Sequence, residues 1–340
     1  MKALVTGAAG FIGSNVVRAL LGAGHAVRAL HLPGEDVRNL AGLDVERVAG
    51  DVTDGPAMRR AAAGCDRVFH LAAIYALWTR DPERMRRVNV DGTRTVLEAA
   101  RAAGVERVVY TSSIARFGGQ GRGRRATEES PFALGPTGDG YSRSKFEAHE
   151  VARAFAGDVD VVIVAPTGPI GPGDVGPTPT GRLLLRALTM PVVVVPDSAT
   201  NFADVRDMAR GHLLAAERGR RGESYLLGHV DLTAVELARE ALALYGLRRA
   251  IVRAPFPLAQ AAGHASLAAA RLLGRAPLFT PAAVRIARLG LTADCSKAVR
   301  ELGLPQTPIR TALRDALTWF AQNGYLTDGA LKRKVLAAAA

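Results

Sequence analysis

The chain has 340 residues, of which 48% are hydrophobic, so it can bury a full core and is not a disordered protein. Its formal net charge is +12, but the arginines are scattered and no nucleic-acid-binding module is recognisable. We attribute the charge first to solvated surfaces, with attraction to an anionic membrane surface as the alternative. The only cysteines, Cys65 and Cys295, are too few for a disulfide framework or a metal site and indicate a reducing cytoplasm.

The amino terminus, MKALVTG, starts directly with a strand pattern, and we expect no signal peptide. No uninterrupted run of about 18 apolar residues occurs, because prolines and polar residues break the most apolar stretch, residues 254–274. We therefore expect a cytoplasmic protein without a membrane-spanning helix. Association with the inner membrane surface is left open.

In the first half of the chain, short apolar runs alternate with helical patterns. Strands are predicted at residues 2–7, 26–30, 45–52, 66–73, 105–113 and 159–166. Helices are predicted between them, at residues 15–24, 55–64, 89–104 and 141–157. This alternation predicts an α/β fold with a Rossmann-type, doubly wound parallel sheet and a ligand crevice at the carboxyl ends of its strands.

Beyond residue 166 the pattern changes. Residues 165–181, rich in proline and glycine, are predicted to be irregular, and residues 201–219 to be a loop turning into a helix. Further helices are predicted at residues 182–190 and 231–246, and strands at 191–195 and 224–228. The second helix carries a capping box, Thr233 with Glu236, and the last hundred residues are mostly helical.

These patterns predict two domains. The first is a dinucleotide-binding domain of residues 1–165, to which residues 191–228 contribute a late strand and helix. The second is a smaller, mostly helical and discontinuous substrate domain of residues 166–190 and 229–335.

Three glycines, Gly7, Gly10 and Gly13, lie between the first strand and the first helix in VTGAAGFIGS. The first permits a tight turn, the second lets a phosphate approach, and the third lets the helix pack on the strand. Amide groups at the helix start would then face a diphosphate. The context of strand, glycine turn and helix predicts a dinucleotide site, with Phe11 and Ile12 among its contacts.

Ordered motifs extend nearly from end to end of the chain. They are TGAAGFIGS, GDVTD, HLAA, NVDGT, VVYTSS, YSRSK, GPGD, PTPTGR, NFADVRDMARGHLLA and DCSKAVRELG. In these motifs the chain resembles the extended short-chain dehydrogenases/reductases of the NAD-dependent epimerase/dehydratase family. It is most similar to the dihydroflavonol-4-reductase-like and hopanoid-associated sugar epimerase groups.

The resemblance implies further cofactor contacts. Asp51 and Val52 should border the adenine, residues 71–73 (Leu71, Ala72 and Ala73) should line the groove, and Asn89 should brace the central strands. Asp51 as a helix cap and Asn89 as a turn former are the alternatives. The remaining contacts that we expect are Thr111, Pro166 and Gly168.

The choice between NAD and NADP depends on the end of the second strand, where NAD enzymes often carry an acid. Here that position falls at His31 and Leu32, neither of which is acidic, and Glu35 and Asp36 follow too late. The relatives that the chain resembles carry an arginine where Leu32 stands. The sequence favours NADP over NAD slightly, with both retained. The basic residues that could meet a ribose phosphate are Arg28, His31 and Arg38.

The catalytic candidates are Ser113, Tyr141 and Lys145. Ser113 ends the fifth strand, and the other two lie one turn apart on one face of the next helix. A free tyrosine has a pKa of about 10, which a neighbouring ammonium and the nicotinamide charge would lower. The resemblance implies that Tyr141 is the general acid and base, that Lys145 tunes it and holds the nicotinamide ribose, and that Ser113 binds the reacting oxygen. Ser112 should face the other way.

Several reactions use such a set. Dehydratases of the family carry Asp-Glu after the active serine or threonine, whereas Ile114 and Ala115 follow here, so we discount dehydration. Sugar-nucleotide epimerases carry an arginine where this chain has Thr200, which weighs mildly against a sugar nucleotide. Residues 256–289 are apolar and would suit a hydrophobic substrate, a membrane-facing patch or an ordinary helical core.

We therefore predict an NAD(P)-dependent oxidoreductase that acts on a secondary alcohol or ketone of a bulky substrate, lipid-like or polycyclic. A nucleotide-sugar epimerase with transient hydride transfer is the alternative. A non-catalytic dinucleotide sensor is disfavoured, because it would need no serine, tyrosine and lysine set. The partner is a small molecule, with no nucleic acid and no metal. Peripheral membrane contact and a homodimer are left open.

Overall fold

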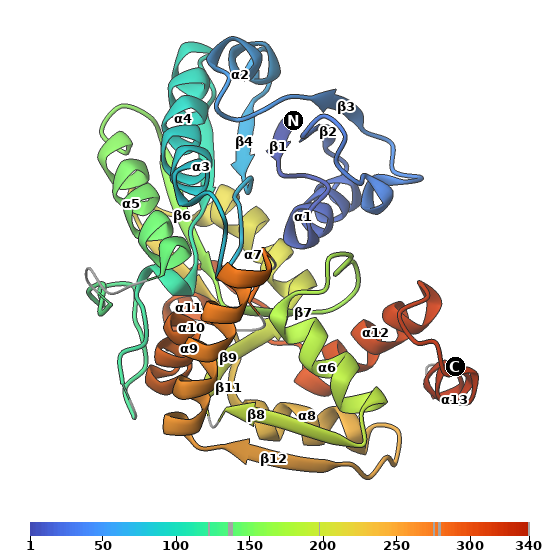
Figure 1. The fold of residues 1–340 in the computed structure, drawn as a ribbon. Coiled ribbons are helices and arrows are strands. Elements are labelled where there is room, and N and C mark those ends of the chain that lie inside the picture. The colour runs from blue at the N-terminus through green and yellow to red at the C-terminus, as the bar shows by residue number, and fades with distance from the viewer. Residues whose placement is uncertain (122, 135–138, 197, 275, 278–279, 339–340) are drawn as a thin grey trace.

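The computed structural model describes residues 1–121, 123–134, 139–196, 198–274, 276–277 and 280–338. Its centre is a seven-stranded sheet in the order β10-β6-β5-β4-β1-β2-β3, with every neighbouring pair parallel (Figure 1). Its strands are β1 (Lys2–Thr6), β2 (Ala26–His31), β3 (Glu46–Ala49), β4 (Arg67–His70), β5 (Arg107–Thr111), β6 (Val161–Pro166) and β10 (Ser224–Leu227). The predicted Rossmann-type doubly wound sheet is confirmed.

Helices cover both faces of this sheet because successive strand residues point to opposite sides. Val5 and Phe69 pack under α1 (Phe11–Gly22), α7 (Val205–Arg218) and α11 (Ser296–Leu302). Leu4 and Val68 pack under α2 (Gly55–Ala62), α4 (Gly92–Ala102) and α5 (Gly140–Phe155). Shorter elements join them: η1 (Arg38–Leu40), α3 (Pro82–Arg86), the π-helical turn η2 (Arg87–Asp91) and η3 (Ile114–Arg116).

The strand order reverses beside β1, since the chain runs outward through β2 and β3 and then returns to β4 on the other side. Such a reversal opens a crevice at the carboxyl ends of the neighbouring strands. The glycine turn follows β1, and the segment of Leu71, Ala72 and Ala73 follows β4. The sheet therefore brings these two predicted cofactor segments together.

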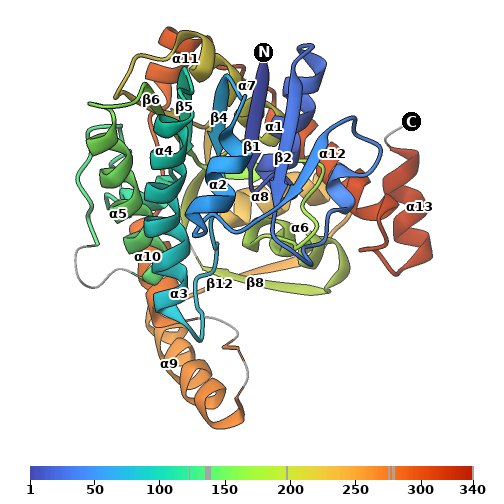
Figure 2. The same ribbon diagram turned by 90° about the horizontal axis from the view of Figure 1, so that it is seen from above.

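Two smaller sheets lie apart from the large one. β7 (Gly168–Ile170), β9 (Ala199–Asp204) and β11 (Val230–Thr233) form the first, and β8 (Val192–Pro196) pairs in parallel with β12 (Ala250–Ala254) in the second. The surrounding helices are α6 (Pro179–Thr189), α8 (Ala234–Ala243), α12 (Ile309–Gln322) and α13 (Gly329–Ala337). Two more helices, α9 (Phe256–Leu273) and α10 (Pro281–Leu289), pack on each other, and α9 projects from the body (Figure 2).

Four of these strands correct the prediction. β7 lies in the segment expected to be irregular, β9 lies partly in the expected loop, and β11 and β12 were not predicted. They are short and are held by pairing with strands distant in sequence rather than by propensity. The predicted capping box of Thr233 and Glu236 is confirmed at the start of α8. Within residues 191–228, β10 is a strand of the large sheet and α7 packs on that sheet, whereas β8 belongs to a smaller sheet.

Candidate active site

The glycine turn after β1 has no room for side chains at two of its three glycines. Gly7 has a φ of +66°, and a Cβ on it would lie 2.8 Å from the Cα of Ala72. A Cβ on Gly13 would lie 2.1 Å from the carbonyl oxygen of Gly7, whereas on Gly10 it would only meet that oxygen at 3.2 Å. No side chain caps the first turn of α1, so its amide groups remain free for an anion. This cradle fits a diphosphate.

The groove wall on the β4 side is fixed by Thr6 and a buried histidine. The Thr6 hydroxyl oxygen accepts hydrogen bonds from the amides of Leu71 and Ala72, each at 3.2 Å. It also lies 2.8 Å from Nδ1 of His70, whose Nε2 lies 3.0 Å from the Thr93 hydroxyl. Burial lowers the pKa of His70 to about 3, so the imidazole is neutral and acts as a rigid connector.

Asn89 joins the loop after β4 to α5. Its side-chain oxygen accepts from the Ile74 amide at 2.7 Å, and its nitrogen donates to the Ile74 carbonyl at 3.1 Å and to the Ser144 hydroxyl at 2.9 Å. Asn89 lies in the π-helical turn η2, a local geometry that is frequent at functional sites. Its bracing role, expected from the resemblance, agrees with these contacts.

Tyr141 lies in the first turn of α5, where Asp139 caps the helix by accepting from the amides of Tyr141 and Ser142. The Tyr141 hydroxyl lies near the side chain of Ser113, whose hydroxyl oxygen accepts from the Ala115 amide at 3.1 Å. Its ring packs with Met85 and Ala115. Asp139 was missed from the sequence, although an aspartate just before a helix is a recognisable cap signal.

The ring of Tyr75 stands edge-on to the ring of Tyr141, with 4.8 Å between their centroids. Burial raises the pKa of Tyr141 above its usual value, and the nearby Ser113 side chain opposes this only in part. The predicted lowering of this pKa requires the nicotinamide charge beside the phenol and stays a prediction, since the protein groups alone raise the pKa. The reason is that the phenol is buried among apolar groups.

Lys145, one turn further along α5, points toward β5. Its ammonium donates to the carbonyl oxygen of Thr111 at 2.8 Å, and burial lowers the pKa of Lys145 to about 8. The Thr111 hydroxyl lies 3.0 Å from Nε2 of the buried His212. Ser112 faces elsewhere, as predicted, and its hydroxyl lies 2.9 Å from Nδ1 of the buried His149. The end of β5 is thus fixed from both faces of the sheet.

The contacts at the end of β2 do not distinguish between NAD and NADP. His31 contacts the carbonyl oxygen of Leu32, and Glu35 accepts from the Leu32 amide at 2.9 Å. Arg38 pairs on the surface with Asp36 at 2.6 Å. Arg28 is not available to a ribose phosphate. It donates to the carbonyls of Ala61 and Ala63 at the end of α2 and pairs with Glu46.

The remaining predicted contacts lie along the same sheet edge. Asp51 follows β3 and accepts from the amide and hydroxyl of Thr53. The helix cap that was the alternative for Asp51 is supplied by Asp54, which caps α2. Val52 is buried in the core. Pro166 ends β6, and a Cβ on Gly168 would lie 2.6 Å from the Phe202 ring, so close packing requires that glycine. Phe11 and Ile12, half-buried, begin α1.

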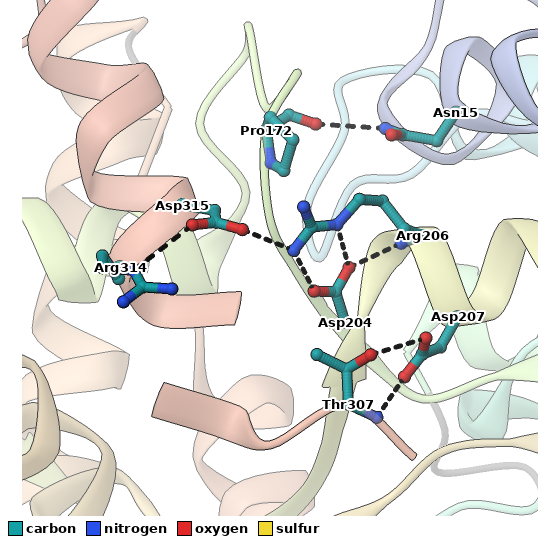
Figure 3. Close-up of polar contacts among 8 residues, drawn as sticks. All are labelled: Asn15, Pro172, Asp204, Arg206, Asp207, Thr307, Arg314 and Asp315. Atoms are coloured by element: carbon teal, nitrogen blue, oxygen red, sulfur yellow. Dashed lines mark hydrogen bonds and ion pairs between the residues drawn. The ribbon is translucent and has the colours of Figure 1, made fainter. Parts of the chain in front are cut away.

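Two asparagines that the sequence did not reveal join the glycine loop to the GPGD segment. Asn15 donates to the carbonyl of Pro172 at 3.0 Å (Figure 3). Asn39 donates to the carbonyls of Ala9 and Gly173 at 3.1 and 2.9 Å. These bonds hold the segment of Pro172 and Gly173 against the glycine loop.

Beside this junction, Arg206 holds two carboxylates (Figure 3). Asp204 is fully buried and bonds the guanidinium through both oxygens, and Asp315 on α12 lies 2.6 Å away. The amide and the hydroxyl of Thr307 donate hydrogen bonds to the nearby Asp207 carboxylate. Thr200 lies on β9, paired with Leu232, so the position expected to carry an arginine in sugar-nucleotide epimerases has no charge.

Comparisons with known proteins agree with this architecture. Residues 3–228 match the NAD dependent epimerase/dehydratase family. A Synechocystis sp. protein, provisionally named dihydroflavonol 4-reductase, is 40% identical over 95% of this chain and 95% of its own. Sterol demethylase protein B of Methylococcus capsulatus is 36% identical over 96% of this chain and 100% of its own. DesIV, a dTDP-glucose 4,6-dehydratase from Streptomyces venezuelae solved with NAD, superposes with a TM-score of 0.77 at 28% identity, covering 96% and 99%.

Proposed function

The chain belongs to the NAD-dependent epimerase/dehydratase family of extended short-chain dehydrogenases/reductases, and from this premise we propose that it reduces the ketone of a bulky, apolar substrate or oxidises the matching alcohol. The observation that carries the proposal is the Tyr141 hydroxyl, which lies near the Ser113 side chain and is surrounded by apolar side chains. Such an environment suits proton exchange with a substrate oxygen.

The residues present fit a nicotinamide dinucleotide. Gly7 and Gly13 keep the turn free of side chains, and the uncapped amides of α1 would hold the diphosphate. When bound, the nicotinamide supplies or accepts the hydride. We propose NADP rather than NAD, because no acid directly follows β2 and the Glu35 carboxylate is engaged by the Leu32 amide. Measured dissociation constants for NADPH and NADH test this choice.

The protein groups handle the proton. Because burial raises the pKa of Tyr141, the phenol keeps its proton at neutral pH and is a donor in the direction of reduction. It gives that proton to the carbonyl oxygen, while the Ser113 hydroxyl donates a hydrogen bond to the same atom. Lys145 adds a positive charge one turn away, fixed by the Thr111 carbonyl.

Apolar side chains next to Tyr141 favour a bulky, apolar substrate. Met85, Ala115 and Ile74 pack around the tyrosine, and the exposed Tyr75 lies on its outer side. The printed name of the Methylococcus relative refers to a sterol, which agrees with a polycyclic substrate. A nucleotide-sugar epimerase remains the second candidate because of the family, although the uncharged Thr200 disfavours a diphosphate substrate there.

Tyr141→Phe tests the assignment with Tyr325→Phe as its control. Each change removes one phenol hydroxyl, but the Tyr325 hydroxyl donates to the Val175 carbonyl, away from Ser113 and Lys145. With a polycyclic ketone and reduced nicotinamide, we expect turnover to fall about 10²–10⁴-fold in Tyr141→Phe and to stay unchanged in the control. Full turnover by Tyr141→Phe would refute the assigned role. Product without net loss of reduced nicotinamide would identify an epimerase.

A further inference from the structure

One segment of the chain carries positive charge without any acid. Residues 241–293 contain no Asp, Glu or Lys, and Glu240 and Asp294 bound this stretch. The segment therefore contributes +7 to the net charge of +12, through Arg248, Arg249, Arg253, Arg271, Arg275, Arg285 and Arg288. Such segregation produces a positive field over one part of the surface.

The sheet of β8 and β12 has an uncovered apolar face in the same region. Val194 pairs in register with Val252, and both point outward, as does Val192; Val194 is 64% exposed. The alternate residues, Val193 and Val195, are buried. Parallel strands are normally covered on both faces, so this open face is unusual.

Helix α9 continues the apolar surface. It follows β12 directly, and its exposed residues recur at helical spacing. Leu258 is 67% exposed and Leu272 is 87% exposed, and the exposed residues between them are alanines and His264. These outward alanines are Ala261, Ala262, Ala265, Ala268 and Ala269. Within the part of the chain that the structure describes, no helix has the length and apolarity to cross a membrane.

An arginine-lined cavity of about 270 Å³ lies where α8 leads toward β12. Arg239, Arg248 and Arg249 line it together with Leu242 and Ile251. Among the described residues, none of these three arginines forms an ion pair within 4 Å, although the charge of Arg239 is felt by the nearby Glu236 carboxylate. A cavity lined by guanidinium groups and apolar side chains fits a phosphate head group attached to an acyl chain.

The far end of α9 contacts the loop after β4, which carries Tyr75 and Arg80. Arg80 in that loop donates to the carbonyl of Gly274, the residue that ends α9. The same loop exposes Tyr75 and Leu77, and the Tyr75 ring contacts Tyr141. The apolar surface therefore extends to the candidate active site.

We propose that α9, the outer face of β8 and β12 and the arginine-lined cavity, together the basic apolar face, dock the protein peripherally on an anionic lipid bilayer. A second copy of the chain would bring two sets of arginines together, which opposes self-association. Nucleic acid would match the charge but not the exposed leucines and valines. The docking goes beyond the proposed function and does not depend on it.

Vesicle flotation with the full-length protein tests the docking. We expect binding to vesicles of phosphatidylcholine with phosphatidylglycerol, and little binding to phosphatidylcholine alone. Arg248→Gln with Arg249→Gln should weaken binding about 30-fold, from the contribution of two arginines near a charged surface. Leu258→Ser with Leu272→Ser should weaken it at least tenfold.

Controls of the same chemistry lie elsewhere on the surface. Arg59→Gln with Arg60→Gln removes two exposed arginines of α2, and Val299→Ser removes an exposed apolar side chain of α11. Both should bind as the unchanged protein does. Equal binding to neutral vesicles, no binding to anionic vesicles, tighter binding to duplex DNA, or equal losses in the controls would each overturn the proposal.

A catalytic readout separates this proposal from the proposed function. With a water-soluble ketone and no vesicles, the arginine and leucine variants should turn over normally. If the unchanged protein turns over the ketone normally but does not bind anionic vesicles, the docking proposal alone is refuted. Intact turnover by Tyr141→Phe with normal vesicle binding would refute the catalytic assignment alone.

Discussion

Gly13→Ala is the sharpest test of the glycine turn. The new methyl group would lie 2.1 Å from the carbonyl oxygen of Gly7, a backbone atom in the turn between β1 and α1. Overpacking of this kind costs about 1–3 kcal/mol. Since the turn has to shift to make room, its amides move away from the diphosphate, and we expect the dissociation constant for NADPH to rise about 10–100-fold.

The assay is a fluorescence titration with reduced nicotinamide, accompanied by denaturant unfolding. Gly22→Ala is the matched control, because a Cβ at Gly22 in the last turn of α1 meets nothing within 4 Å. It should leave binding unchanged and stabilise the helix by about 0.5–1 kcal/mol. Gly10→Ala, with a 3.2 Å contact, should fall between them. Unchanged affinity in Gly13→Ala would refute the assignment of the turn to the cofactor.

Two further predictions concern stability. His70, His149 and His212 are buried, and burial lowers their pKa values to about 3, 3 and 4. Between pH 6.5 and the folded-state pKa of each histidine, the unfolded chain takes up protons that the folded chain does not. Urea titrations should therefore show the free energy of unfolding decreasing as the pH is lowered, by about 1.4 kcal/mol per pH unit for each histidine. His212→Gln should remove about a third of that slope, and an unchanged slope would contradict the cause. Arg206→Met leaves the Asp204 carboxylate buried without its partner and should destabilise by about 3 kcal/mol, whereas Arg314→Met, which loses a contact of 3.6 Å, should cost less than about 0.5 kcal/mol; equal losses would show that burial of Asp204 is irrelevant.

The large sheet was predictable because strands buried on both faces read as continuous apolar runs. β5 and β6 are clear examples, with Val108, Val109 and Ile163 all fully buried. β7 and β9 gave no such signal. β7 is three residues long and begins at a glycine that is required for packing against Phe202. Its existence depends on a partner strand more than thirty residues away, which no local pattern encodes.

The candidate site shows the same division. Motif spacing led to Ser113, Tyr141 and Lys145, and the structure places the first two near each other. Their cofactor and catalytic roles remain predictions. The direction of the Tyr141 pKa shift could not be read from spacing, because it depends on how many apolar groups surround the phenol. Asn15 and Asn39 escaped notice for a related reason, since their acceptors lie in a segment far along the chain.

The pairing of β8 with β12 also has a consequence for synthesis of the chain. β8 leaves the ribosome well before β12 exists, so its valines and both of its backbone edges stay open during that interval. An open apolar strand is a template for aggregation. Any version of the protein that stops at the end of β10 would keep this hazard permanently, so shortened forms should be recovered from inclusion bodies even though all seven strands of the large sheet are present.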